Sequence, residues 1–220
     1  MLAVDGVTTD VDVRSRVAEL TVIAERRLAE GTEGELPEIQ AWRRAFSKMG
    51  LKPTQYRCAS EALLRRLRKE GSLPRIHPLV DLCNAASAAF AIPVAALDLA
   101  RIADYVEVRY ATGSETYAAF SGEIEHPEPG EVVFADGAGQ AHARRWTNRQ
   151  SAASAVRDQT TAVLIVAEAL HATAGTDVER LVVELADEIG RAWSTAVATQ
   201  MLSSGSPRFE LCAIERQGPD

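Results

Sequence analysis

The amino-acid sequence predicts an α+β fold, with a mixed, mainly antiparallel sheet flanked by helices. Helical periodicity dominates the first part of the chain, strand-like alternation dominates the middle, and helical periodicity returns near the end. Helices and strands segregated in this way are typical of the α+β class. The 220 residues, 46% hydrophobic and 25% charged, are enough to bury a sizeable core in one domain.

The expected helices follow from apolar spacing and from residues that start or stop a helix. Proline is favoured in a first helical turn, and glycine favours a helix end. In one segment leucines occupy one face and basic residues the other, which is the pattern of a surface helix. The expected helices span Val11–Glu30, Pro37–Lys48, Ala59–Glu70, a segment that begins at Pro78, and Val178–Met201.

Strands are expected where apolar and polar residues alternate between turn-forming residues. Asp104–Tyr110 alternates in this way, and Glu115–Phe120 could pair with it. Gly130–Ala135 is a further expected strand, from which Gln140–Trp146 returns across a turn at Asp136-Gly137. The apolar run Thr161–Leu170 is too short to assign by periodicity, and it fits a strand that leads into a helix.

Composition and charge argue against several classes of protein. No run approaches the roughly 18 consecutive apolar residues of a membrane span, and the first residues carry acids where a secretory signal carries basic residues. We therefore expect a cytoplasmic protein without a membrane span. Cys58, Cys83 and Cys212 form no CxxC motif, so we expect reduced thiols rather than a metal or redox site. The net charge of −7 argues against indiscriminate nucleic-acid binding.

The usual catalytic and cofactor motifs are absent from the sequence. It has no GxSxG, HExxH, P-loop or GxGxxG motif, and its histidines show no metal-ligand spacing, so we expect neither metal nor cofactor. Within the apolar run LPRIHPLVDLCN, Asp81 and Asn84 lie three residues apart and project from the same side of a helix. They either brace a neighbouring loop through backbone hydrogen bonds or face a pocket.

The run EALLRRLRKEGSLPRIHPLVDLCNAASAAFAIPVAALDLARI resembles the B3/B4 domain of the phenylalanyl-tRNA synthetase beta subunit. The following DYVEVRYATGSETYAAFSGE and EVVFADGAGQAHARRW resemble the strand and hairpin that come next in that family. The counterparts of the family motifs are Arg66-Leu67 with Gly71, Pro74 to Asn84, and Ile92 to Asp98.

The resemblance covers Trp42 to Leu170 and implies a B3/B4-like fold. The chain is too short for the remainder of a synthetase, so it resembles the freestanding B3/B4 proteins, which also show the pattern WTNRQS followed by a threonine pair. We expect an N-terminal helical extension at residues 1–36, a B3/B4-like domain at 37–212 and a tail at 213–220.

What the resemblance implies is quality control in translation. In the synthetase this domain hydrolyses tyrosine wrongly esterified to the phenylalanine tRNA, and a freestanding relative is expected to act in trans on a released, mischarged tRNA. An aminoacyl ester is already activated, so a positioned water and a few hydrogen-bond donors can suffice. We expect a monomer or homodimer of this kind. The alternative is a non-catalytic module that keeps the fold and binds tRNA or a free amino acid.

The resemblance and the side-chain chemistry together nominate a set of site residues. Asn148 and Gln150 are expected to hold the water or the α-amino group, while Asn84, Trp146 and Thr161 bind the substrate. Asp81 and Asp98 are expected to lie behind the site, and Asp81 with Asn84 is expected to fix the geometry of the loop between Ala91 and Asp98. The clusters RRLRK and RRWTNR form either solvated faces or phosphate contacts, through Arg65, Arg66, Arg68, Arg144, Arg145 and Arg149.

Three positions differ from the family pattern. The histidine of the editing site is matched by Ala95, which favours the non-catalytic alternative. The family's glycine pair falls where this chain has Arg145-Trp146-Thr147-Asn148. The tyrosine-selecting glutamate aligns near Val166, with Glu168 two positions further on, so an amino acid other than tyrosine is also open as the substrate.

Overall fold

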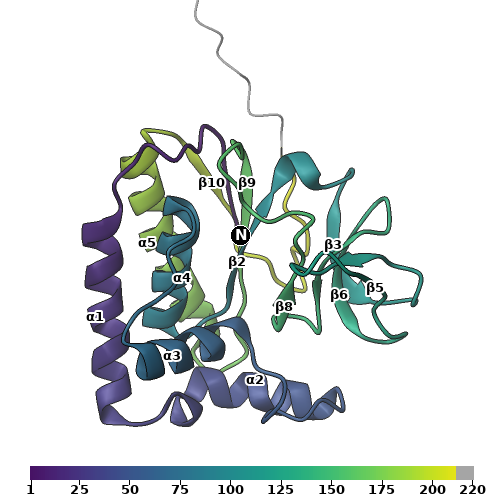
Figure 1. Cartoon of the computed structure of the whole chain (residues 1–220), viewed down its shortest axis with the longest axis horizontal. Helices are drawn as coiled ribbons and strands as arrows, with labels where there is room; N and C mark the ends of the chain where they lie inside the picture. The colour runs from purple at the N-terminus through teal and green to yellow at the C-terminus, as the bar shows by residue number, and fades with distance from the viewer. Residues whose placement is uncertain (212–220) are drawn as a thin grey trace, which may run out of the picture.

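Helices lie on one side of the molecule and antiparallel strands on the other (Figure 1). The structure is a computed structural model that describes residues 1–211, so Cys212 and the expected tail at 213–220 lie outside the described residues. Every pairing between named strands is antiparallel, and a single bridge, between Thr116 and Gln140, is parallel among the described residues. The predicted α+β class is confirmed.

The strands form two larger sheets and one short hairpin. The first sheet has the order β10 (Val197–Thr199), β1 (Leu2–Val4), β9 (Val163–Ala167), β2 (Val94–Asp98). The second has the order β3 (Val106–Tyr110), β6 (Val132–Asp136), β7 (Ala141–Arg144), β8 (Arg149–Gln150), and β4 (Tyr117–Ala118) pairs with β5 (Ile124–Glu125). In Figure 1 the first sheet lies between the helices and the second sheet.

The helices begin and end within three residues of the expected segments, except the last one, which begins four residues earlier and ends eight residues earlier than expected. They are α1 (Arg14–Glu30), α2 (Pro37–Lys48), α3 (Ala59–Glu70), α4 (Pro78–Phe90) and α5 (Ala174–Trp193). Gly71 ends α3 with a φ of 69°, a conformation that glycine adopts without strain. The expected continuation to Met201 is wrong, because Ser194 leaves the helix at a φ of 52° and the chain turns into β10.

Two features of the sheets differ from the expectation. Glu115–Phe120 does not pair with the strand before it, because β4 pairs with β5 and β3 pairs with β6 instead. The segment Leu2–Val4 was not expected to be a strand, yet it lies between β9 and β10. Residues 1–36 therefore supply β1 to the first sheet, while α1 packs along α4.

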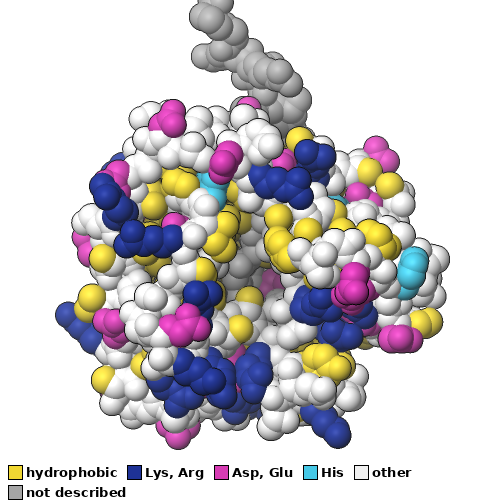
Figure 2. All heavy atoms as spheres, in the orientation of Figure 1, with side chains coloured by type: hydrophobic (Ala, Val, Ile, Leu, Met, Phe, Trp, Pro, Cys, Tyr) yellow, Lys and Arg dark blue, Asp and Glu magenta, His cyan; other side chains and the backbone are white. Residues whose placement is uncertain are grey.

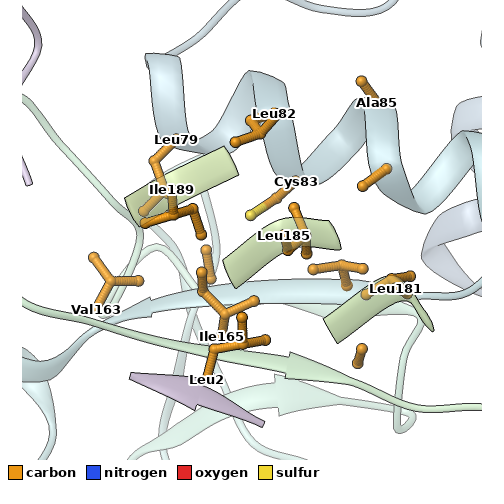
Figure 3. Packing of buried hydrophobic residues seen from close by; sticks show 14 of the residues in the cluster. Leu2, Leu79, Leu82, Cys83, Ala85, Val163, Ile165, Leu181, Leu185 and Ile189 are labelled. Carbon is orange, nitrogen blue, oxygen red and sulfur yellow. The ribbon is translucent and has the colours of Figure 1, made fainter. Parts of the chain in front are cut away.

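The main core lies between the first sheet and the helices α4 and α5 (Figure 3). Leu82 of α4 and Leu185 of α5 approach Ile165 of β9 there, and each is at most 1% exposed. Full burial of such a side chain contributes about 1.5–3 kcal/mol. This packing fixes β9, and so it fixes the backbone position of the residue that follows, Glu168.

A smaller core beneath α2 and α3 supports the turn between β7 and β8. It contains Trp42, Phe46 and Leu64, and Trp146 from the turn packs against it. No helix within residues 1–211 is long and apolar enough to cross a membrane.

Candidate functional site

Two adjoining cavities lie near the end of β9 and the turn between β7 and β8. The large cavity has a volume of about 300 Å³ and the small cavity about 60 Å³. They share a wall made by Phe134, Trp146, Val166 and Glu168. Figure 2 shows this face of the molecule hollowed between the helical side and the second sheet. The two cavities are the candidate site.

The turn that forms the shared wall has an uncommon backbone. Arg145 and Trp146 have φ values of 49° and 58°, in the left-handed region that usually favours glycine. Each such residue costs about 1–3 kcal/mol and persists only where its surroundings hold it. Here the amide of Arg145 donates to Glu131 over 2.9 Å, and the amide of Trp146 donates to the carbonyl of Val132 over 2.8 Å. This is the segment where the resemblance places the family's glycine pair.

The Trp146 indole is held from two sides. Its ring meets the ring of Trp42 edge to face, with centroids 5.0 Å apart. Its Nε1–H donates to Oε1 of Glu168 over 3.1 Å. The aromatic pair therefore sets the position of a donor that points at the only carboxylate lining either cavity, within the described part of the chain.

Glu168 is the titratable group most changed by this site. Burial raises the pKa of its carboxyl to about 7, and the bond from Trp146 together with the positive charge of the chain's α-amino group offsets only part of that increase. Its backbone amide donates to the carbonyl of Pro93 over 3.3 Å, which ties it to the start of β2. A carboxyl with a pKa near 7 exchanges a proton readily at neutral pH.

Two of the expected catalytic residues line the small cavity beside Trp146. Nδ2 of Asn148 donates to the carbonyl of Arg57, and Nε2 of Gln150 donates to the carbonyl of Ala96, each over 2.7 Å. Both amide donors are thus engaged in holding the cavity wall. Ala95 also lines this cavity. The resemblance aligns Ala95 with the family's histidine, so at this point of the site the chain has a methyl group in place of an imidazole.

The family model of the B3/4 domain matches residues 41–181. The chain belongs to the B3/4 domain family. Among solved structures, it is similar to an N-terminal fragment of the phenylalanyl-tRNA synthetase beta subunit from Pyrococcus horikoshii, with a TM-score of 0.45 and 10% identity. That similarity covers 55% of this chain and 41% of the fragment, so the chain spans less than half of that protein. No curated protein matches the sequence.

The other expected substrate-binding residues of this B3/4 chain lie outside the two cavities. Asn84 is partly buried on α4 and lines neither cavity. Thr161 is exposed, and its carbonyl accepts from the amide of Val7. Asn84 and Thr161 are therefore not brought together with Trp146.

The two aspartates expected to lie behind the site have different partners. Asp98 ends β2 and accepts from the Thr160 hydroxyl over 2.8 Å and from the Ala100 amide over 3.0 Å. Asp81 accepts from the amide of Ile76 over 2.8 Å. Asp81 therefore braces the turn before α4, and the expectation that it fixes the loop 91–98 is wrong.

The arginines expected to contact phosphates are mostly paired with carboxylates of the same chain. On α3, Arg65 and Arg68 contact the buried Glu33 at 3.4 and 3.0 Å, and Arg66 contacts Glu70 at 2.9 Å. The sequence separation between α3 and Glu33 hides this pairing from a motif search.

The second basic cluster is paired in the same way. Arg144 is 4% exposed and its Nε lies 2.9 Å from Glu131. Arg149 lies 2.9 Å from Glu125. Arg145 lies 4.9 Å from the Tyr56 ring centroid, in cation–π contact, and 3.9 Å from Glu131. Burial leaves Arg144 unable to reach an external phosphate.

A buried polar network near the second sheet was not expected. His142 bonds to the Ser154 hydroxyl through Nδ1 at 2.8 Å and to Asp136 through Nε2 at 3.1 Å. Burial lowers the pKa of His142, although Asp136 acts in the opposite direction. These side-chain types suit nucleophilic catalysis, but all three residues are buried and line neither cavity. The network joins the β6–β7 hairpin to the segment after β8.

Proposed function

We propose that this B3/4 domain hydrolyses the ester bond of a mischarged aminoacyl-tRNA in trans, with water as the nucleophile. The observation that carries the proposal is the position of Glu168 in the wall between two largely apolar cavities, with a pKa of about 7. Family membership supports the choice of substrate. A carboxylate of this pKa matches the requirement for a general base at neutral pH.

The two cavities divide the substrate between them. The large cavity is walled mainly by apolar side chains, among them Val106, Val178 and Leu202, and its volume of about 300 Å³ suits an amino-acid side chain. The small cavity, about 60 Å³, is lined by Asn148, Gln150 and Arg149 and has room for about two water molecules. The scissile ester then lies at the shared wall, beside Glu168.

The chemical step needs one proton acceptor and one leaving group. The Glu168 carboxylate takes a proton from a water molecule, whose oxygen forms a bond to the ester carbonyl carbon. The bond between that carbon and the ribose oxygen breaks, and the proton passes from Glu168 to the ribose oxygen. Water, ester and products balance without a co-reactant. Asn148 and Gln150 keep the wall in place, and their amide oxygens can accept from the substrate's α-ammonium group.

Selection of the amino acid follows from the shape of the large cavity. An apolar cavity excludes a charged side chain because burial of an unpaired charge is costly. It discriminates only modestly between apolar side chains that differ by one methylene, by about 1–3 kcal/mol. We therefore propose that the substrate carries a large apolar side chain.

A panel of mischarged tRNAs tests the proposal. The purified chain should release the amino acid from at least one tRNA esterified with a large apolar residue, faster than buffer alone does. It should leave aspartyl-tRNA and lysyl-tRNA intact. If no tRNA of the panel lost its ester faster than in buffer, the proposed hydrolase activity would be overturned.

The second candidate is a binding module without turnover. Ala95 at the small cavity and the amides of Asn148 and Gln150 favour it, because a methyl group and a neutral amide cannot take up or release a proton at neutral pH. Under this alternative the chain binds tRNA or an amino acid, and Glu168→Gln changes binding while no ester is lost from any substrate.

A further inference from the structure

One stretch of this acidic chain carries basic residues and no acidic ones. Between Glu38 and Glu61 the sequence contains no aspartate or glutamate, although the net charge of the whole chain is −7. The basic residues in this stretch are Arg43, Arg44, Lys48, Lys52 and Arg57. Such a local excess of positive charge creates a positive potential at that surface.

The structure separates these cations into paired and unpaired ones. Arg43 and Arg57 both contact the buried carboxylate of Glu61, at 2.6 and 3.6 Å. Arg44, Lys48 and Lys52 are exposed and contact no carboxylate within 4.0 Å among residues 1–211. They differ in this from the arginines of α3 and of the β7–β8 turn. We call these three residues the basic stripe.

The basic stripe lies along the outer face of α2 and continues into the following turn. Arg44 and Lys48 are four residues apart in α2 and so project from the same side, roughly opposite Trp42 and Phe46, which face the core. Lys52 follows after the helix end, and its carbonyl accepts from the amide of Tyr56 over 2.9 Å. In Figure 2 basic side chains gather along the lower part of the molecule, where α2 and α3 lie in Figure 1.

The turn that ends the basic stripe is hydrogen-bonded to residues that line the small cavity. Nδ2 of Asn148 donates to the carbonyl of Arg57, and the amide of Ala59 donates to the carbonyl of Thr147 over 2.9 Å. Arg145 stacks on Tyr56 at the same junction. A polyanion on the stripe would therefore reach the cavity through this turn.

We propose that Arg44, Lys48 and Lys52 bind successive phosphates of the single-stranded 3′ end of tRNA and bring the ester on its terminal nucleotide to the shared wall beside Glu168. This inference rests on the proposed function, because the terminal nucleotide carries the ester. Charge complementarity selects a nucleic-acid strand, and three unpaired cations in a row suit a flexible backbone. The stripe replaces the arginines of α3 as the RNA contact.

Charge reversal with a matched control tests the stripe. The test variant is Arg44→Glu/Lys48→Glu/Lys52→Glu. The control is Lys69→Glu/Arg75→Glu/Arg101→Glu, which makes the same change in charge at exposed residues outside α2 and the turn that follows it. Filter binding of uncharged tRNA is measured at two salt concentrations, because binding without an ester does not depend on turnover. Thermal unfolding of each variant confirms that it folds.

We expect the stripe variant to lose at least about tenfold in affinity at low salt, while the control stays within about threefold of the unchanged protein. The slope of log affinity against log salt should fall by about 2, at about 0.7 for each lost phosphate contact with a single strand. Equal losses in both variants, or no binding by the unchanged protein, would overturn the stripe. Ester loss from aminoacylated tRNA is measured separately. If the basic stripe does not bind tRNA but the protein is a hydrolase, ester loss is seen while the two variants bind tRNA equally. If the stripe binds tRNA but the protein is not a hydrolase, the stripe variant loses affinity and no ester is lost.

Discussion

The indole Nε1–H of Trp146 donates to Oε1 of Glu168 over 3.1 Å, across the wall that the two cavities share. The bond joins the β7–β8 turn to the end of β9. Glu168 lines both cavities and has a pKa of about 7, so loss of the hydrogen bond from Trp146 should alter the proton affinity of the carboxyl.

Glu168 should destabilise the fold at high pH. Its pKa rises from an ordinary value of 4.5 to about 7 on folding, so the folded state holds the proton more tightly than the unfolded state. The carboxyl is protonated in both states below pH 4.5, and above pH 7 its ionisation costs up to about 3 kcal/mol of folding free energy. Glu168→Gln should therefore be more stable than the unchanged protein at pH 8, with a smaller difference at pH 5.

Urea unfolding at the two pH values measures this difference. Glu30→Gln, at the exposed end of α1, serves as the control and should give the same difference at pH 5 and pH 8. A Glu168→Gln variant that is less stable than the unchanged protein at pH 8 would contradict the predicted cost of the buried carboxylate.

Trp146→Phe should move the pKa of Glu168 upward. Phenylalanine keeps an aromatic ring but removes the Nε1–H that favours the ionised carboxyl. The base form of Glu168 is then depleted at pH 7, and the rate of ester hydrolysis should fall several-fold there and recover at higher pH.

The other tryptophan of the pair provides the control. Nε1 of Trp42 is buried without a hydrogen-bond partner among the described residues, so Trp42→Phe removes no bond to Glu168. Both variants lose packing, but Trp42→Phe keeps the Nε1–H donor of Trp146, so Trp146→Phe should shift the midpoint of the pH–rate profile more than Trp42→Phe does. The same shift in both variants would assign the effect to packing.

Arg144 should act as a structural residue. Its guanidinium is 4% exposed and bonds to Glu131, so removal of one partner leaves buried charge without compensation. Arg144→Ala should lower the free energy of unfolding by about 3–5 kcal/mol. Arg149→Ala, at a side chain that is 38% exposed, should cost about 1 kcal/mol or less. Denaturant titration measures the free energy of unfolding of both variants. A larger loss for Arg149→Ala than for Arg144→Ala would contradict this assignment.

Asp136 should stabilise the β6–β7 hairpin at neutral pH. Burial alone would raise the pKa of Asp136, but bonds from Ala103, Gln140 and His142 outweigh it and lower the pKa overall. A lowered pKa means that the stabilisation is present above the ordinary value of 3.8 and is lost as pH falls through the lower folded value. Asp136→Asn should therefore be less stable at pH 7, by about 2–4 kcal/mol.

Thermal unfolding at pH 7 and pH 3 checks the sign of this effect. The gap between the unchanged protein and Asp136→Asn should narrow at pH 3. A gap that stays constant with pH would mean that the variant disturbs packing and that the ionised form of Asp136 contributes nothing.

Local signals were sufficient to predict several elements from the sequence. α2 and α3 have the expected bounds because each combines an apolar face with a residue that starts or stops a helix, Pro37 and Gly71. The β6–β7 hairpin also agrees, because the turn at Asp136-Gly137 separates two short runs that favour strands. Each of these signals acts within a few residues along the chain.

Features that depend on distant partners could not be predicted. Leu2–Val4 is too short to show a period, and its partners Val163–Ala167 and Val197–Thr199 lie at the other end of the chain. The ion pairs of the two basic clusters could not be predicted for the same reason, because their partners Glu33, Glu125 and Glu131 come from other elements. Only the fold reveals which charges are already neutralised.

The candidate site was predicted in part. Trp146, Asn148 and Gln150 were nominated and line the small cavity together, because they belong to one continuous motif. Glu168 was noted only for its position in the alignment, and its raised pKa follows from burial that no local pattern reveals. Asn84 and Thr161 were nominated as well, and they lie elsewhere because helix and strand ends separate them from the turn.

The pH–rate profile of ester hydrolysis by the unchanged protein and by Glu168→Gln tests the central claim most directly. With a tRNA from the panel that is hydrolysed, the rate of the unchanged protein should rise as pH increases through about 7 and then level off. Glu168→Gln should be slower by about a hundredfold or more, the usual contribution of a general base, with no rise near pH 7. A Glu168→Gln variant with the rate and profile of the unchanged protein would contradict the account.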